Sequence, residues 1–166
     1  MLFETFSFSG LNLQNRLVRS ATYENRADDD GFVTESLIEL YEDLARGGIG
    51  LMITGFTLVH PSGRAVPQML CIHSDIYIQG LRKLTRAVHE LGGLIAVQIV
   101  HGGRQSFPIL LGGREPLAPS AVHDSSTGIT PRAMTDSEIW EIIDAFADAA
   151  RRARITGFDA VQIHGA

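Results

Sequence analysis

Residues 91–103 read LGGLIAVQIVHGG, and this stretch decides the fold. Gly92 and Gly93 act as a stop signal for the helix before them, because glycine readily adopts the backbone conformation that ends a helix. Leu94–Val100 follows as an apolar run of strand length, which is typical of a strand buried on both faces. His101 and two more glycines then begin a polar loop. A helix, a glycine stop, a buried strand and a polar loop form the repeating unit of a parallel α/β fold.

The same unit recurs on both sides of this stretch. Buried strands are predicted at residues 17–22, 49–56, 94–100 and 160–163. Amphipathic helices are predicted between them, at residues 36–46, 75–91 and 135–156. A short hairpin at residues 2–16, with its turn at Ser9-Gly10, is expected to precede the first strand.

Side chains that can cap a helix stand at the start of each predicted helix. Ser36 with Glu39, and Thr135 with Glu138, both fit the capping box, in which the two side chains bond each other's backbone amides. Ser74 is the expected cap of the second helix. The third helix is expected to bury a stripe made of Ile139, Ile142, Ile143, Phe146 and Ala150.

The order of these elements predicts a parallel sheet with right-handed crossovers. About four β/α units fit into the 166 residues, whereas a closed TIM (β/α)8 barrel usually needs about 250. The count therefore suits a hairpin followed by the N-terminal half of such a barrel. It suits a small open sheet equally well, so the number of units does not decide between the two.

The composition disfavours several function classes. The net charge is −5, and the longest basic cluster, residues 151–154, closes a predicted helix, so nucleic-acid binding is not expected. Cys71, the single cysteine, cannot form an internal disulfide and is expected to be a small buried hydrophobe. The only lysine, Lys83, lies in a predicted helix, where it cannot serve as a strand-end Schiff base. Neither a signal peptide nor a long apolar run is recognisable, so we expect a cytoplasmic protein without a membrane span.

Polar and small residues stand where the predicted strands end. In a parallel α/β fold the carboxyl ends of the strands form the edge at which chemistry takes place. The residues expected at this edge are 21–24, 54–57, 98, 101–104 and 164. The long connection at residues 101–131, rich in glycine and proline, follows a strand and is expected at the same edge, either as a functional loop or as a plain surface cover.

Gln98 interrupts an otherwise apolar strand. A buried amide without hydrogen-bond partners costs about 1–3 kcal/mol, so this side chain must be bonded to something. Because it offers both donors and an acceptor, it suits a heterocycle with a mixed edge, such as a flavin pyrimidine ring. A glutamine bonded to neighbouring backbone inside a barrel is an equally good interpretation.

Two histidines, His101 and His164, end different strands. A metal pair is disfavoured because the first strand offers no further ligand and Asp159, before the last strand, is expected to face away from the edge. His101 is expected to be a structural histidine, with its hydrogen bonds satisfied within the protein. A neutral histidine that donates a hydrogen bond to a substrate oxygen is the interpretation of His164. Most of the other four histidines are expected to be solvated.

Five stretches together resemble the old yellow enzyme family, and they occur in the family's order along the whole chain. The resemblance implies FMN-dependent oxidoreductases that use NADH or NADPH and fold as a TIM barrel. The stretches are residues 15–22 (NRLVRSAT), 61–64 (PSGR), 98–104 (QIVHGGR), 118–121 (APSA) and 157–166 (GFDAVQIHGA).

The resemblance implies roles for residues of the first strand. Ala21, Thr22 and Tyr23 match the segment whose backbone meets the flavin near its reactive edge. Family members often carry threonine or cysteine at the position of Tyr23, where the side chain tunes the flavin. Tyrosine departs from that pattern, so its tuning role is open.

The resemblance also implies roles on the other strands. Gly55 and Phe56 match the segment that places a backbone amide against the isoalloxazine ring, and Gln98 matches the glutamine that bonds the pyrimidine edge. His164 matches the first of two polar residues that hold the carbonyl oxygen of the substrate. The implied reaction passes hydride from NADH or NADPH, by way of FMN, to an activated alkene such as an enone.

The family pattern continues past His164, so residues 1–166 are expected to be the N-terminal part of a single flavin-binding barrel domain. Alone, the chain is expected to be catalytically incompetent, to hold FMN weakly or not at all, and to associate with other copies through its exposed sheet edges. Two alternatives stay open: a non-catalytic half-barrel that serves binding or assembly, and another FMN-dependent TIM-barrel dehydrogenase, such as a dihydroorotate dehydrogenase relative.

Overall fold

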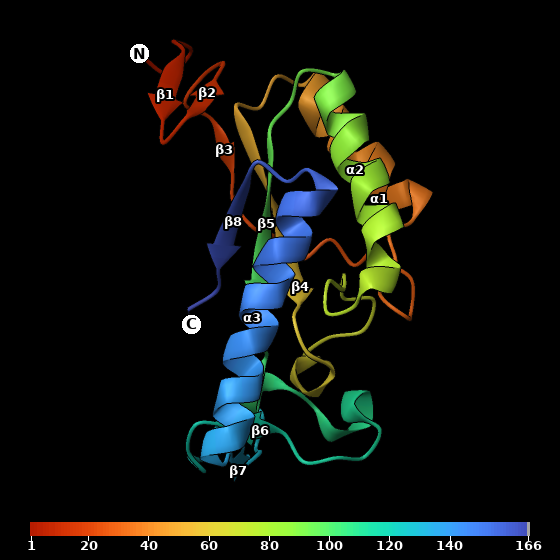
Figure 1. The fold of residues 1–166 in the computed structure, drawn as a ribbon, viewed down its shortest axis with the longest axis vertical. Coiled ribbons are helices and arrows are strands. Elements are labelled where there is room, and N and C mark those ends of the chain that lie inside the picture. Colours follow the sequence, from red (N-terminus) through yellow and green to blue (C-terminus); the bar gives the residue numbers. More distant parts are fainter. Residues whose placement is uncertain (166) are drawn as a thin grey trace.

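A computed structural model describes residues 1–165. Its main sheet has four parallel strands in the order β3-β4-β5-β8, and three long helices cover one side of it (Figure 1). The strands are β3 (Val18–Arg19), β4 (Leu51–Leu58), β5 (Ile95–Val100) and β8 (Ala160–Ile163). The helices are α1 (Glu35–Arg46), α2 (Ile78–Glu90) and α3 (Asp136–Thr156). This alternation of strands and helices confirms the predicted parallel α/β architecture.

The first strand is much shorter than the predicted 17–22, because β3 pairs with β4 at only two positions. Beyond β3 the backbone N–H of Gly55 in β4 donates to the Glu24 carboxylate at 2.6 Å. A side chain thus takes the place of a strand partner, and the backbone of residues 20–25 leaves the ladder. The segment still runs beside the end of β4.

Two of the three predicted caps are wrong and one is confirmed. Thr34 caps α1, since its extended backbone lets Oγ1 accept the N–H of Leu37 at 3.2 Å, and Ser36 already lies inside the helix. A 3-10 turn, η2 (Asp75–Tyr77), precedes α2, and Ser74 makes no side-chain cap there. The capping box of Thr135 and Glu138 at the start of α3 forms as predicted.

The predicted stripe of α3 is buried only in part. Ile139, Ile142, Phe146 and Ala150 are half-buried, and Phe146 packs against the core. Ala149, Ala153 and Thr156, near the C-terminal end, are the buried residues of this helix, whereas Ile143 is 47% exposed. The helix has 21 residues and extends far past the carboxyl end of β5, as Figure 1 shows. Only its last turns therefore pack on the sheet, and its first turns cover the loop that follows β5.

The core lies between the sheet and the helices. Ile95, Val97 and Ile99 of β5 face the helices and are at most 1% exposed. The side chains between them face the other way, since successive side chains of a strand alternate. Gln98, on that other side, is only half-buried. We call this side of the sheet the open face.

The hairpin and the long loop complete the chain. Strands β1 (Phe6–Phe8) and β2 (Leu11–Leu13) form the predicted antiparallel hairpin. The loop after β5 contains the turns η3 (Gly103–Gln105) and η4 (Pro108–Leu111), and β6 (Leu117–Ala118) pairs with β7 (Arg132–Ala133). A further turn, η1 (Pro61–Gly63), follows β4. Cys71 is buried, as predicted.

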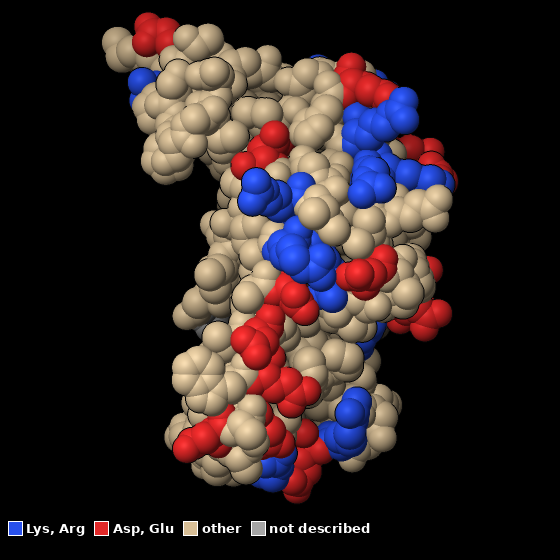
Figure 2. Space-filling model, viewed as in Figure 1, with Lys and Arg blue, Asp and Glu red and all other residues tan. Residues whose placement is uncertain are grey.

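Charged side chains gather in separate patches on the face shown in Figure 2, with basic groups at the C-terminal end of α3 and acidic groups along the rest of that helix. This distribution complements the helix dipole. Arg152 also binds Asp75 at 2.7 Å, which ties the end of α3 to the start of the second helical segment. The basic cluster is therefore part of the fold's own ion pairing. Among the described residues, no helix is both long and apolar enough to cross a membrane.

Candidate functional site

Three neighbouring strands place a row of side chains on the open face. Phe56 of β4 lies beside Gln98 of β5, which lies beside Gln162 of β8. The Gln98 amide Nε2 donates to Gln162 Oε1 at 2.7 Å. His164 follows two residues later, and its ring meets the Phe56 ring edge-on with 6.4 Å between centroids. Gln98 and His164 thus share one face of the sheet, which is the arrangement that a flat ligand would need.

Tyr23 extends this row with a second aromatic ring. Its ring stacks on Phe56 with 5.4 Å between centroids and 10° between planes. Its hydroxyl lies near the Pro67 carbonyl and 2.6 Å from Asn25 Oδ1. Burial, and next the Glu24 carboxylate, raise the pKa of Tyr23 above its usual value, so the phenol stays neutral. The side chain therefore contributes an aromatic surface, with its polar end directed at the protein.

Glu24 holds the first-strand segment against β4. Its carboxylate accepts both the Gly55 N–H, at 2.6 Å, and the hydroxyl of the fully buried Tyr41. A Cβ at Gly55 would meet Glu24 and would lie 2.7 Å from the Thr22 carbonyl oxygen, so only glycine fits. The Gly55 amide is thus engaged within the protein. Phe56 is the member of this predicted pair that lies on the open face.

Ala21 and Thr22 lie in the segment that Glu24 anchors. The Thr22 hydroxyl donates to the Ser20 carbonyl at 3.1 Å, so its side chain is turned back along its own strand. The Thr22 carbonyl stands so close to Gly55 that a side chain at that glycine would meet it. Their backbone is therefore the part of these residues that runs along the end of β4.

An irregularity in β4 creates this arrangement. The register with β5 shifts by one residue between Ile53 and Phe56, which is a β-bulge. The Thr54 hydroxyl within the bulge accepts the backbone N–H of Gln98 at 3.2 Å. The bulge therefore turns Phe56 onto the open face and fixes the backbone of Gln98 at the same time.

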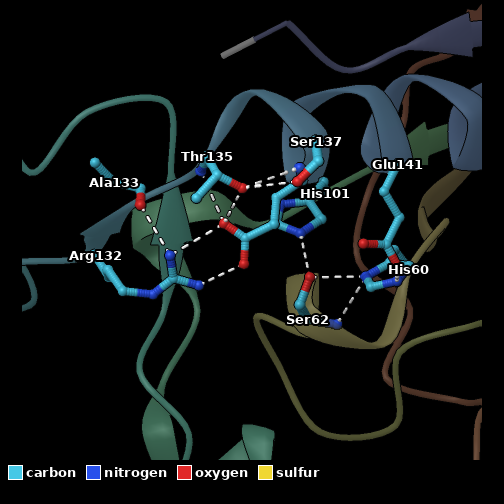
Figure 3. Close-up of polar contacts among 9 residues, drawn as sticks. His60, Ser62, His101, Arg132, Ala133, Thr135, Ser137 and Glu141 are labelled. Carbon is cyan, nitrogen blue, oxygen red and sulfur yellow. Dashed lines mark hydrogen bonds and ion pairs between the residues drawn. The ribbon is translucent and has the colours of Figure 1, made fainter.

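His101 is a structural histidine, as predicted. Its Nδ1 accepts the N–H of Gly103 at 3.1 Å, so its Nε2 carries the proton and donates to Ser62 Oγ at 2.9 Å. The Ser62 hydroxyl then donates to His60 Nδ1 at 2.8 Å, and His60 Nε2 lies 3.3 Å from Glu141 (Figure 3). Burial, and next the neighbouring His60, lower the pKa of His101 to about 4. Both ring nitrogens of this neutral histidine are committed to the protein.

The other histidines are less solvated than predicted. The side chain of His60 is only 27% exposed, and Nδ1 of His73 is buried with no partner within residues 1–165. His89 bonds Asp159 at 2.9 Å, and Asp159 also accepts the N–H of Ile95 at the start of β5. Asp159 thus faces away from the strand ends, as predicted. Within the described residues, no group of three or more His, Cys, Asp or Glu side chains could hold a metal ion.

A cavity of about 270 Å³ adjoins the row at the strand ends. It brings together residues from β4, β5 and β8 with residues of the connecting loops. Its lining residues are Phe56, Ala65, Val66, Val100, His101, Gly102, Gln105, Phe107 and His164. Apolar walls with a few polar groups are typical of a small-molecule site.

A larger cavity of about 560 Å³ lies outside the strand ends, between α3 and the loop after β5. Several of its polar and charged groups are already paired with one another, although Arg114 and Glu115 also line it. Arg132 binds Glu138 through two bonds of 2.6 and 3.0 Å, and His60 faces Glu141 (Figure 3). The Arg132 guanidinium holds the pKa of Glu138 down at about 2. We therefore place the candidate site at the smaller cavity, beside the amides of the open face.

Gln162 and Ser62 were not predicted as site residues, and Glu24 was expected at the strand ends but without its partners. Gln162 could have been found, because Val161-Gln162-Ile163 repeats the apolar–amide–apolar pattern of Val97-Gln98-Ile99 on the next strand. Glu24 and Ser62 carry no such signal. Their partners lie 31 and 39 residues away, and no local pattern indicates those pairings.

The whole chain matches one protein family. The sequence profile of the NADH:flavin oxidoreductase / NADH oxidase family covers residues 1–166. The chain belongs to this family. This match confirms the resemblance to the old yellow enzyme family that the five sequence stretches indicated.

Individual relatives agree with the family. A NADH oxidase of Thermoanaerobacter brockii is 42% identical over 166 residues, which are 99% of this chain and 26% of that protein. An NADPH dehydrogenase of Geobacillus sp. (strain WCH70) is 40% identical, over 100% of this chain and 48% of that protein. The solved structure of the old yellow enzyme homologue from Zymomonas mobilis matches with a TM-score of 0.87 at 34% identity, over 98% of this chain and 48% of that one.

These matches assign the fold class. Old yellow enzymes are TIM barrels, and the chain matches about half of the length of the solved homologue. The described hairpin and four-stranded sheet are thus the N-terminal half of a (β/α)8 barrel, and the open-sheet alternative is wrong. The open face of the sheet corresponds to the inside of such a barrel.

Proposed function

We propose that the chain forms part of an FMN-dependent enzyme that passes hydride from NADH or NADPH to an activated alkene of the enone type. The observation that carries this proposal is the row of Phe56, Gln98 and Gln162 on the open face, with His164 at its end. Membership of the NADH:flavin oxidoreductase family supports it. This family membership does not favour the alternative of a dihydroorotate dehydrogenase relative.

The side chains of the open face fit an isoalloxazine ring. Within residues 1–165, Gln98 Oε1 and Gln162 Nε2 have no hydrogen-bond partner, although their residues bond each other. An acceptor and donors therefore stand side by side next to the Phe56 ring. The pyrimidine part of FMN has alternating carbonyl and N–H groups, and such an edge needs this mixture. FMN, when bound, supplies the hydride-transfer chemistry that no side chain can provide.

The chain's own residues would bind and orient the reactants. Gln98 would bond the pyrimidine edge, and the backbone of Ala21, Thr22 and Tyr23 would flank the ring where Glu24 holds it. The backbone of Gly55 and Phe56 would approach the ring from β4.

His164 would donate a hydrogen bond to the substrate's carbonyl oxygen and so stabilise the negative charge that grows there during hydride transfer. Its backbone N–H donates to the Ile99 carbonyl at 3.0 Å, which fixes the residue just past the end of β8. The ring contact with Phe56 places the imidazole beside the cavity of about 270 Å³. An enone carbonyl held there would lie next to the proposed ring site.

The extent of the chain limits what it does alone. It spans about half the length of the solved homologue, and we propose that residues 1–166 are the N-terminal part of a single flavin-binding domain in the cytoplasm. Val18 of β3 is 50% exposed and Ile163 of β8 is 68% exposed. We expect isolated chains to associate through these two edge strands, with no affinity for nucleic acid or membranes.

The test of the proposed function is an FMN titration of the purified 166-residue chain. Because the described sheet would contact a flavin ring from one side only, we expect any binding to be weak, with a Kd of ~0.1–1 mM. Gln98→Leu should weaken binding at least ~10-fold through the lost amide contacts. Gln79→Leu, on the exposed surface of α2, is the matched control and should bind as the wild type does. Gln98→Leu that binds FMN as tightly as the wild type would contradict the proposal.

A further inference from the structure

We propose that Gln162 is a positioning residue that fixes which way round the Gln98 amide stands. The inference rests on the proposed function, because it concerns the contact that Gln98 would make with the ring. It is carried by the 2.7 Å bond from Gln98 Nε2 to Gln162 Oε1 and by the direct pairing of the two residues across β5 and β8.

A glutamine amide can present either its oxygen or its nitrogen in a given direction. The two orientations have nearly the same shape and differ only in where the donor and the acceptor lie. In Gln98 the backbone N–H is held by Thr54 Oγ1 at 3.2 Å, so the main chain is fixed but the amide end is not. Something at the amide end must therefore select one of the two orientations.

Gln162 couples its own amide to that of Gln98, so the two amides can turn only together. Because its Oε1 accepts from Gln98 Nε2, the Gln98 nitrogen is directed toward β8 and the Gln98 oxygen toward the remaining open space. No other residue in 1–165 bonds either atom of the Gln98 amide. The orientation that results leaves an acceptor for a ligand N–H, and the Gln162 nitrogen stands beside it as a donor.

This arrangement matches an imide, in which one N–H lies between two carbonyl groups. The Gln98 oxygen is complementary to the N–H, and the Gln162 amide nitrogen is complementary to a neighbouring carbonyl. A reversed Gln98 amide would place a donor against the N–H and leave both groups unsatisfied.

The position of Gln162 makes the inference testable. The residue is exposed on β8, which lies at the edge of the described sheet, so substitutions there should leave the fold intact. Gln162→Met removes the acceptor while keeping the length of the side chain. Gln162→Glu keeps an acceptor at the same place, so it should preserve the orientation of Gln98. Gln79→Met, on the exposed surface of α2, is the matched control.

The first arm of the experiment follows the Gln98 side-chain N–H₂ signals by NMR in the chain without FMN. In the wild type and in Gln162→Glu, one proton should be shifted downfield and exchange slowly with solvent, because it is hydrogen-bonded. In Gln162→Met both protons should move toward free-amide positions. Signals that are the same in all three proteins would overturn the inference.

The second arm is an FMN titration of the same proteins, followed by the visible absorption of the flavin. Gln162→Met should weaken binding about 10-fold and lose the spectral shift, whereas Gln162→Glu, which keeps the acceptor for Gln98 but loses the donor to the ring carbonyl, should weaken binding less than Gln162→Met does and keep the spectral shift. Wild-type binding with equal affinity in Gln162→Met would overturn the inference and leave the proposed function standing. Binding that Gln98→Leu leaves unchanged as well would overturn the proposed function itself, together with the inference that rests on it.

Discussion

His101 and His164 end neighbouring strands of one sheet, yet the structure uses them differently. The ring of His101 is closed off, since Gly103 bonds one nitrogen and Ser62 bonds the other. His164 lies past the end of β8, on the open face, with its ring against Phe56. A place at the end of a strand is therefore not enough to make a residue catalytic. What separates the two is that both ring nitrogens of His101 are bonded within the protein, whereas the His164 ring lies against Phe56 on the open face.

The same division separates other strand-end residues. We call the residues whose polar groups are bonded within the protein the committed group. It contains His101 and Ser62, which bond each other, and Gly55 and Glu24, which do the same. Gln98, Gln162 and His164 belong to the group on the open face. Substitutions in the committed group should lower stability, and substitutions on the open face should change ligand binding.

The largest effect is expected for Gly55→Ala. The new methyl group would meet the Glu24 carboxylate and lie 2.7 Å from the Thr22 carbonyl, so the first-strand segment must move. We expect the free energy of unfolding to fall by about 2–4 kcal/mol, as for other overpacked sites. Urea denaturation measures this. Gly165→Ala has nothing within 4 Å of the new methyl group and should leave stability unchanged; an equal loss in both variants would contradict the account.

The pH dependence of His101 should produce the next largest effect. The pKa of this buried histidine is lowered to about 4 in the folded state, while the unfolded chain titrates near 6.5. Between these values the unfolded state binds more protons, so stability is fully present above pH ~6.5 and is lost as the pH falls toward 4. The loss should reach about 3 kcal/mol.

The control for this prediction is His101→Gln, which removes the titrating group. Other groups also titrate in this range, including His73, whose pKa burial and Arg64 lower. The difference between wild type and variant isolates the contribution of His101. Parallel stability curves for the two proteins between pH 4 and 7 would show that His101 is not the committed, neutral residue that the structure indicates.

A smaller effect is expected for Ser62→Ala. The substitution leaves the Nε2–H of His101 without an acceptor and interrupts the chain to His60. We expect a loss of about 1–2 kcal/mol in the free energy of unfolding, measured by thermal denaturation. FMN affinity should not change by more than about twofold. A large loss of FMN affinity with unchanged stability would move Ser62 from the committed group to the open-face group.

The smallest effect on stability is expected for His164→Ala. The residue is near the end of the chain and lies outside the buried core, so the free energy of unfolding should change by less than about 0.5 kcal/mol. Because its proposed role is with the substrate, FMN affinity should also be nearly unchanged. Denaturation and FMN titration together measure this, and a loss of stability similar to that of His101→Gln would erase the distinction between the two histidines.

Local patterns predicted much of this molecule. The strand at residues 160–163 and the capping box of Thr135 were predicted correctly, because both depend on residues close together in the sequence. Gln98, the polar residue within an otherwise apolar strand, indicated a ligand-binding side of the sheet, and this signal too depends only on neighbouring residues. The predicted stripe of α3 is buried only in part, because periodicity says which residues share a side, and it does not say how far the helix extends past the strand it packs on.

His101 was predicted to be structural, but the partners of the committed residues could not be predicted. The bond of Glu24 to Gly55 and the bond of Ser62 to His101 join segments far apart in sequence, and each replaces a backbone or solvent partner that the pattern would suggest. The two-residue length of β3 has the same origin. Such pairings depend on the positions of two strands at once, and they become visible only in the folded chain.

The most direct test of the account maps FMN onto the backbone amide signals of the ¹⁵N-labelled chain by NMR. We expect the largest shifts at Phe56, Gln98, Gln162 and His164, and no shifts at His60, Ser62 or Glu141. Shifts that gather around the outer cavity of about 560 Å³, with the open face unchanged, would contradict the claim that the open face holds the flavin ring.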